Sequence, residues 1–273
     1  MRRAVALVFL LVPALAHATP HALPFSYPYA TLAQGAIEIE QYTDLTPIPV
    51  IDFDGDPIHV PQVTLTTELE YGITDKLELG LYFQLSDFPS GEPGGAIEYP
   101  ARIDGIKQRL RYRLAEANEW PVDVSLYGEV AELQQELEFE GKINLEKRIG
   151  RLQLLVNLWA EREWYYAGQQ EWVLNPTGGG DWEINPNVHI GLEGWMHAEY
   201  GGTVNSGNPN LGGSSVAFNP APHVFLGPTL ELGSGRFWFT VAPYVQLTDL
   251  GRSGQIGDQY GRFWIRSIVG VEL

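Results

Sequence analysis

The chain has 273 residues, no cysteine, and 34 acidic against 17 basic side chains, which gives a formal net charge of −17. The acidic excess argues against a nucleic-acid-binding protein, because a phosphate-binding surface needs clustered Lys and Arg that face outward. The missing cysteines exclude a fold built on disulfides. No later stretch has the ~18 consecutive apolar residues of a transmembrane helix.

The beginning of the chain has the composition of a secretory signal. Two arginines precede an apolar run over residues 4–15, and the run ends in the small-residue sequence Ala-His-Ala. The run is too short to span a membrane as a helix. The sequence therefore predicts export, a signal peptide over residues 1–18, and an N-terminal periplasmic segment over residues 19–34.

From residue 35 onward, apolar and polar residues alternate in about twelve segments, each close to the ~9–11 residues that a tilted membrane strand needs. In the third segment, Leu77, Leu79 and Leu81 share one face and Glu78 lies on the other. The eighth segment alternates least, because it contains three consecutive glycines. The predicted strands cover residues 35–44, 62–71, 76–85, 104–114, 122–131, 136–147, 152–161, 171–182, 188–199, 221–232, 237–247 and 261–273.

The connections between these segments alternate in length, and short periplasmic turns with long outer loops are typical of outer-membrane barrels. The tight connections are residues 72–75, 148–151, 185–187 and 233–236. The long ones are residues 46–61, 86–102, 164–170, 200–220 and 248–260. Residues 115–120 and 132–135 fit this pattern poorly. An even number of strands returns the end of the chain to the periplasmic side.

Six aromatic residues fall near predicted strand ends on the outward side, where interfacial girdles lie. They are Tyr71, Phe83, Phe139, Trp172, Phe237 and Phe263. Together these patterns predict an all-β fold, a transmembrane up-and-down antiparallel β-barrel of about 12 strands over residues 35–273. Its expected location is the outer membrane of a Gram-negative cell, with membrane lipid around it.

The hairpin over residues 71–79, Tyr-Gly-Ile-Thr-Asp-Lys-Leu-Glu-Leu, resembles hairpins of channel-like outer-membrane proteins. These include families labelled as outer-membrane components of phenol-degradation pathways. The resemblance implies a channel-like barrel over the whole mature chain. The last segment departs from those families, because they commonly end on an aromatic residue and this one ends on Leu273.

The most specific feature of the predicted lumen is a ladder of four basic residues on the fourth strand. Like charges two residues apart on one strand face repel unless neighbouring strands supply acids, and each would cost roughly 2–4 kcal/mol if it faced lipid at the midplane. The ladder is Lys107, Arg109, Arg111 and Arg113, with Glu78 predicted on one side and Asp123 and Glu129 on the other. Further inward charges are Glu38, Glu40, Glu68, Glu70, Glu138, Glu140, Glu146 and Arg266. The pattern fits either a selective pore or a salt-bridged plug.

A second candidate site lies near the predicted outer mouth. His197 and His223 have inward parity on adjacent strands, and Glu199 shares their face. Two imidazoles and a carboxylate can hold Zn²⁺ or another transition metal, or titrate as a pH-sensitive gate. They also fit ordinary polar residues at a wet mouth.

These patterns predict a passive channel or transporter for a small solute, with a charged lumen and no cofactor. The alternative is a non-conducting structural or surface-interaction barrel with a plugged lumen. A lipid-modifying enzyme is the third possibility. It is disfavoured because the histidines have lumen parity, although Ser206, Ser214 or Ser215 could approach them. Expected partners are membrane lipid and the general secretion and barrel-assembly machinery, and not nucleic acid.

Overall fold

The computed structural model of the protein describes residues 21–200, 222–248 and 260–273. The predicted signal peptide, most of the predicted loops over residues 200–220 and 248–260, and the three loop serines lie outside these ranges. No helix in the described part of the chain is long and apolar enough to cross a membrane.

All regular elements among the described residues are β-strands, and their positions confirm the predicted segments. The strands are β1 (Ile37–Ile51), β2 (Pro57–Thr74), β3 (Leu77–Asp87), β4 (Ala101–Arg113), β5 (Asp123–Leu133), β6 (Glu136–Ile149), β7 (Leu152–Tyr165), β8 (Gln170–Leu174), β9 (Thr177–Asn185), β10 (Val188–Tyr200), β11 (His223–Ser234), β12 (Phe237–Gln246) and β13 (Phe263–Glu272).

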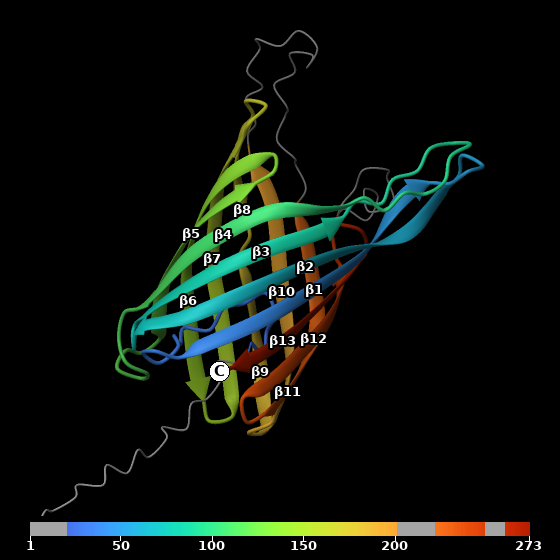
Figure 1. Cartoon of the computed structure of the whole chain (residues 1–273). Coiled ribbons are helices and arrows are strands. Elements are labelled where there is room, and N and C mark those ends of the chain that lie inside the picture. The colour runs from blue at the N-terminus through green and yellow to red at the C-terminus, as the bar shows by residue number, and fades with distance from the viewer. Residues whose placement is uncertain (1–20, 201–221, 249–259) are drawn as a thin grey trace, which may run out of the picture.

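The strands close into an antiparallel barrel, which confirms the predicted fold class (Figure 1). Apart from β8 and β9, strands that are neighbours in the chain pair with each other or are joined through these two, and β13 pairs back to β1 through eight residue pairs. β8 and β9 lie end to end between β7 and β10. They occupy one position in the wall, so the barrel has twelve strands.

The interruption between β8 and β9 explains the weak alternation of the eighth predicted segment. Pro176 lies in the gap and has no N–H to give to the ladder. A Cβ on Gly179 would lie 2.3 Å from the Leu192 carbonyl oxygen and 3.1 Å from the Leu23 side chain. Glycine at this position therefore lets β10 and the N-terminal residues approach the wall.

The wall is apolar outside and polar inside, as a barrel in lipid requires. On β6 and β7, Asn144 and Asn157 are fully buried, whereas Ile143 and Leu158 on the opposite face are 43% and 52% exposed. The six predicted girdle aromatics are also exposed on the outer face. A soluble protein of this size would bury such side chains.

The prediction of an outer loop over residues 46–61 is wrong. β1 and β2 stay paired as far as Ile51 and Pro57, and their hairpin projects beyond the barrel (Figure 1). β1 leaves β13 after Leu45, so among the described strands Pro47 and Pro49 have a partner on one side only, and proline is tolerated at such an edge. The proline-rich sequence therefore forms strand and not loop.

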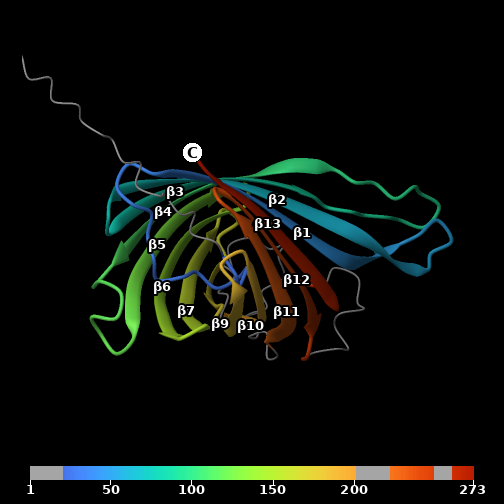
Figure 2. The ribbon, with the colours of Figure 1, turned by 90° about the horizontal axis from the view of Figure 1, so that it is seen from below.

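The described residues before β1 do not form a segment separate from the barrel. Residues 21–34, here called the luminal segment, run through the interior enclosed by the strands (Figure 2). Leu23, Ser26 and Leu32 are at most 2% exposed. Residues 21–32 of the expected periplasmic segment thus lie inside the barrel, and the boundary of a separate N-terminal segment stays a prediction.

Candidate functional site

The backbone of the luminal segment is held by side chains of the barrel wall. Glu193 of β10 accepts the N–H of Phe25, at 3.1 and 3.2 Å from its two oxygens. Asn157 of β7 accepts the Tyr27 N–H at 2.6 Å and donates to the Tyr27 carbonyl at 3.0 Å. Because a buried backbone N–H needs a partner, these wall side chains fix the path of the segment.

The second half of the segment follows the same pattern. Glu146 of β6 accepts the Tyr29 N–H at 3.0 Å, and Glu78 of β3 accepts the Leu32 N–H at 2.7 Å. The segment then joins the wall, where the Gly35 N–H donates to the Gly72 carbonyl at 2.8 Å. The segment thus crosses the lumen from β10 to the start of β1.

Near the N-terminal end of the segment, Phe25 lies in a cluster of aromatic side chains. The Phe25 ring stacks on Trp195, with ring centroids 4.5 Å apart, and meets Tyr244 edge-on at 5.3 Å. The Arg266 guanidinium lies 3.7 Å above the same ring, and Arg266 is paired with Asp44 at 2.7 and 2.8 Å. Aromatic and cation–π contacts therefore anchor Phe25.

Tyr27 lies at the centre of the lumen among basic and aromatic side chains. Its hydroxyl is 3.0 Å from that of Tyr82, and the Lys142 ammonium lies 4.4 Å from its ring. Lys142 pairs with Glu140 at 2.6 Å. Tyr27 and Lys142 are not among the site residues that the sequence predicts.

The basic ladder lies inside the barrel, and Arg109 and Arg111 are its buried centre. Arg109 contacts three glutamates: Glu68 at 2.7 Å, Glu78 at 2.6 Å, and Glu70. Arg111 donates to both oxygens of Glu78, at 2.7 and 3.0 Å. Glu78 therefore pairs with the ladder as predicted. Arg109 also extends across β3 and pairs with Glu68 and Glu70 of β2.

This reach is possible because the register partner of Arg109 on β3 is Gly80. A Cβ on Gly80 would lie 2.6 Å from Arg109 Nε and 2.8 Å from Glu68 Oε1. The glycine therefore leaves room for the guanidinium to lie across β3. Tyr82 also accepts a hydrogen bond from Arg109 Nε at 2.8 Å.

The two ends of the ladder have different partners from its centre. Lys107 lies 3.4 Å from Glu129 and 3.3 Å from Glu138. At the opposite rim, Arg113 donates to the Asp75 carbonyl at 2.8 Å and lies 3.3 Å from Glu116. Asp123 is not brought to the ladder.

Asp123 lies beside the connection between β4 and β5, where it accepts the Asn118 N–H at 2.7 Å. The alternation placed it correctly on the inner face, but the slant of the strands puts it beyond Arg113. Its contact stabilises the turn and leaves the ladder to Glu78 and Glu68.

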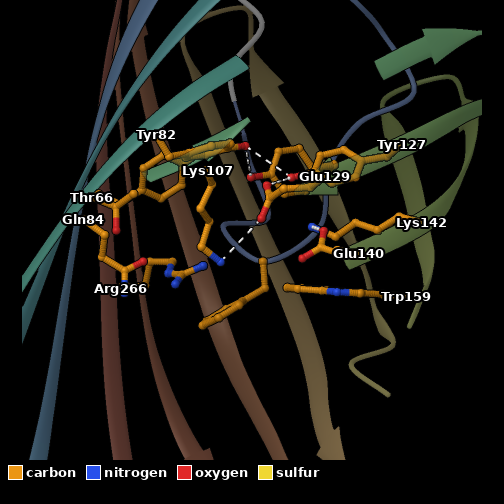
Figure 3. A pocket seen from close by; sticks show the side chains of 13 residues that line it. Thr66, Tyr82, Gln84, Lys107, Tyr127, Glu129, Glu140, Lys142, Trp159 and Arg266 are labelled. Atoms are coloured by element: carbon orange, nitrogen blue, oxygen red, sulfur yellow. Dashed lines mark hydrogen bonds and ion pairs between the residues drawn. The ribbon is translucent and has the colours of Figure 1, made fainter. Parts of the chain in front are cut away.

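A cavity of about 110 Å³ lies beside the luminal segment (Figure 3). Rings of Tyr42, Tyr82, Tyr127 and Trp159 form part of its wall. Its cations are Lys107, Lys142 and Arg266, and each is paired with a carboxylate. The cavity therefore combines aromatic surfaces with charges that are already neutralised.

His197 and His223 lie inside the barrel with ring centroids 6.5 Å apart, and Tyr260 packs against both at 4.5 Å. Both ring nitrogens of His197 have protein partners, Asn175 at 2.8 Å and Glu199 at 3.1 Å. His223 Nδ1 lies 2.8 Å from the Gln246 amide nitrogen. The described geometry is an aromatic and hydrogen-bonded cluster, and the metal site of these residues stays a prediction.

The largest omission of the sequence analysis is the luminal segment. Its sequence, His-Ala-Leu-Pro-Phe-Ser-Tyr-Pro-Tyr-Ala, is apolar and aromatic. A segment left in water would expose these rings, so the composition was a usable signal for burial. Alternation could not detect it because the segment belongs to no sheet.

Two solved structures with this fold are outer-membrane proteins. The COG4313 outer membrane channel from Pseudomonas putida F1 superposes with a TM-score of 0.59 at 13% identity, over 90% of this chain and 98% of that one. The NanC porin gives 0.51 at 8% identity, over 86% and 98%. At these identities the likeness establishes the fold alone.

Sequence comparison gives a family match over residues 115–263. The matching profile is described as a family of unknown function, DUF6662. No curated protein matches the chain. The matched part covers more than half of the sequence, from the connection before β5 to the start of β13.

Proposed function

The chain belongs to the DUF6662 family, and we propose that it is an outer-membrane channel that carries a small solute passively and is closed in this structure by its luminal segment. The fold it shares with outer-membrane channels supports the class of protein. The expected location is the outer membrane of a Gram-negative cell.

The main support for the proposal is that side chains, and not strand backbone, hold the luminal segment. Among the described residues, the backbone of residues 21–32 makes no hydrogen bond to the backbone of a strand. Its anchors are side chains such as Glu193, Asn157 and Glu146. The segment can therefore leave the lumen without breaking any hydrogen bond of the barrel sheet.

The cavity beside the segment indicates the class of solute. Its cations are paired with acids, so a strongly charged ion would have to break an existing pair to bind there. Its aromatic faces offer stacking and cation–π surfaces. These features favour a small neutral or zwitterionic molecule with an apolar face.

A reversible tether tests the proposal. The hydroxyl oxygens of Ser26 and Thr177 are 2.9 Å apart, and the chain has no other cysteine to interfere. We expect the double variant Ser26→Cys/Thr177→Cys to be silent in a planar bilayer when oxidised and to give discrete current steps when reduced. Each single variant should behave like the parent and ignore the reductant.

Equal conductance in the oxidised and reduced states would show that the segment does not control passage. Silence of the parent and of the reduced variant, with a folded barrel, would favour the second candidate, a non-conducting barrel with functional outer loops. The observation behind that candidate is the fully buried ion-pair network of Arg109 and Arg111. A lipid hydrolase is not favoured, because His197 and His223 lie inside the barrel.

A further inference from the structure

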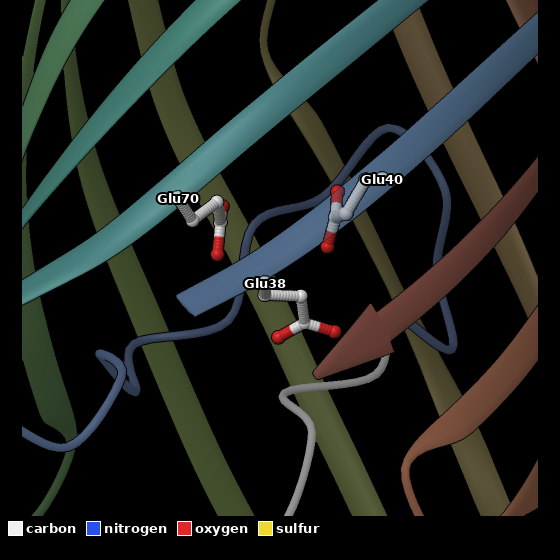
Figure 4. A group of neighbouring side chains, drawn as sticks. All are labelled: Glu38, Glu40 and Glu70. Carbon is white, nitrogen blue, oxygen red and sulfur yellow. The ribbon is translucent and has the colours of Figure 1, made fainter. Parts of the chain in front are cut away.

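Three carboxylates of the inner wall converge where β1 meets β2. Glu38 and Glu70 are register partners across the two strands, and Glu40 lies two residues further along β1. One ligand oxygen from each lies within 4.8 Å of the others. Figure 4 shows the three side chains directed into a common space. All three are fully buried.

Two oxygens of this group, Glu40 Oε1 and Glu70 Oε2, are buried and accept no hydrogen bond from the described residues. The other oxygen of each is already used: Tyr42 donates to Glu40 Oε2 and Arg109 to Glu70 Oε1. Arg109 is shared with Glu68 and Glu78. Among the described residues, the cation that contacts Glu70 is therefore divided among three carboxylates.

An imidazole from the luminal segment faces the same group. His21 is 2% exposed, its Nε2 has no hydrogen-bond partner among the described residues, and that atom lies 3.9 Å from Glu40 Oε1. The ring stacks on Trp238 at 5.6 Å, and Trp238 donates its indole N–H to Glu38. A single side chain therefore orients one carboxylate and the imidazole.

We propose that one divalent first-row transition-metal ion, such as Mn²⁺ or Zn²⁺, binds between the barrel wall and the luminal segment. Its ligands are Glu38, Glu40 and Glu70 of the wall and His21 of the segment. Zn²⁺–oxygen bonds of about 2.0–2.2 Å place two oxygens of one ion at most roughly 4.4 Å apart. The three carboxylate oxygens lie within 4.8 Å of one another, so a shift of a few tenths of an ångström brings them within this limit. Carboxylates suit Mn²⁺, and an imidazole shifts preference from Ca²⁺ and Mg²⁺ toward transition ions.

The site joins two parts of the molecule that are otherwise linked through hydrogen bonds and ring contacts. Three ligands come from β1 and β2 and the fourth from the first described residue of the luminal segment. The bound ion therefore fastens that end of the segment to the wall. The inference does not depend on the channel proposal, because it concerns binding and not conduction.

The test uses the protein expressed from its full sequence, purified in detergent and stripped with EDTA. Mn²⁺ is titrated and followed by electron paramagnetic resonance. We expect one tightly bound Mn²⁺ per chain with coupling to one nitrogen, displaced by Zn²⁺ at lower concentration than by Ca²⁺. His21→Ala should remove the nitrogen coupling and weaken binding about tenfold or more.

The variant Glu40→Gln/Glu70→Gln should weaken binding at least tenfold. Glu161→Gln is the matched control, because Glu161 is a buried glutamate on β7, away from β1 and β2, and it should bind as the parent does. His223→Ala should keep the nitrogen coupling. The readings on the parent and on His21→Ala, a change outside the strands, stand even if the glutamate variant does not fold.

A folded parent that binds no Mn²⁺ would overturn the proposal, because the carboxyls would then be sharing protons. Nitrogen coupling that survives His21→Ala and disappears in His223→Ala would place the ion at the other histidine cluster and overturn it as well. Preference for Ca²⁺ over Zn²⁺ would contradict the assigned class of ion.

Discussion

The luminal segment is held by two walls of opposite chemistry. On β2 to β7, the inner face is charged and polar, with Arg109 and Arg111 buried against glutamates. On β10 to β13, the inner face is aromatic, and Trp195 and Phe225 stack at 4.2 Å. The charged wall accepts the N–H groups of Tyr29 and Leu32, and the aromatic wall takes the Phe25 ring and accepts its N–H through Glu193.

Substitutions in the two walls should have different effects. Each group of the charged wall balances others, so loss of one leaves buried charges without a partner. On the aromatic wall the Arg266–Asp44 pair stays intact when a ring is removed, so a lost ring leaves only a smaller apolar contact. Defects in the charged wall should therefore destabilise the barrel, and defects at the aromatic wall should mainly release the segment.

The largest effect is expected from Arg109→Ala. It removes the shared partner of Glu68, Glu70 and Glu78 and should lower the free energy of unfolding by about 3–5 kcal/mol. Denaturant unfolding of the protein in detergent measures this. Arg148→Ala is the control, because its side chain is 46% exposed and its pair with Glu183 is 3.5 Å long, so its loss should cost at most ~1 kcal/mol. Equal effects would contradict the proposed dependence.

Phe25→Ala tests the aromatic wall. Loss of the ring should weaken docking of the segment by about 3 kcal/mol, which is roughly a 100-fold shift in its equilibrium. Hydrogen exchange should then be faster in residues 21–34 and unchanged in the strands. Thr31→Ala removes only an exposed hydrogen bond to the Asp75 carbonyl and should change exchange less than tenfold. Faster exchange of the strands as well would mean that the segment supports the barrel.

The sequence predicts the charged wall better than the aromatic one, and the reason is physical. A charge cannot face lipid, so alternation assigns Arg109 and Glu129 to the lumen without ambiguity. In β12, Phe237, Trp238 and Phe239 are successive aromatics, and the alternation that puts Phe237 outward puts Trp238 inside without indicating what its ring packs against. Trp238 lies inside because Gly270 opposite leaves room for its ring.

The alternation of apolar and polar residues also does not predict ion pairs between strands that are not adjacent. The pattern places Glu78 next to the ladder, but it gives no sign that Arg109 spans Gly80 to reach Glu70. The same holds for the luminal segment, whose contacts are set by the closed barrel as a whole. Neighbouring strands are thus predictable, and contacts across the lumen are not.

Gly80→Ala tests whether the charged wall needs the space that glycine leaves beside Arg109. The added Cβ meets Arg109 and Glu68 at less than 3 Å, so the guanidinium must shift, and we expect a loss of about 1–3 kcal/mol. The temperature at which the folded barrel loses its mobility shift on a gel measures it. Gly128→Ala is the control, since a Cβ there meets nothing within 4 Å. A loss of the same size at Gly128 would point to glycine flexibility and not to room for Arg109.

The smallest effect is expected from Asn157→Ala, and its control lies directly opposite on the next strand. Asn157 and Asn144 are register partners on β7 and β6, and both are fully buried. Asn157 bonds both the N–H and the carbonyl of Tyr27, whereas Asn144 donates to Ser125 of the wall. Asn157→Ala should weaken docking by about 1–2 kcal/mol and speed exchange at Tyr27 about tenfold.

Asn144→Ala should leave exchange at Tyr27 unchanged, although it also removes a buried hydrogen bond of the barrel. If both substitutions speed exchange equally, the segment responds to the stability of the whole barrel and its side-chain anchors have no separate role. If only Asn157→Ala does so, the segment is an independently docked element. In that case the charged wall also controls whether the lumen is filled.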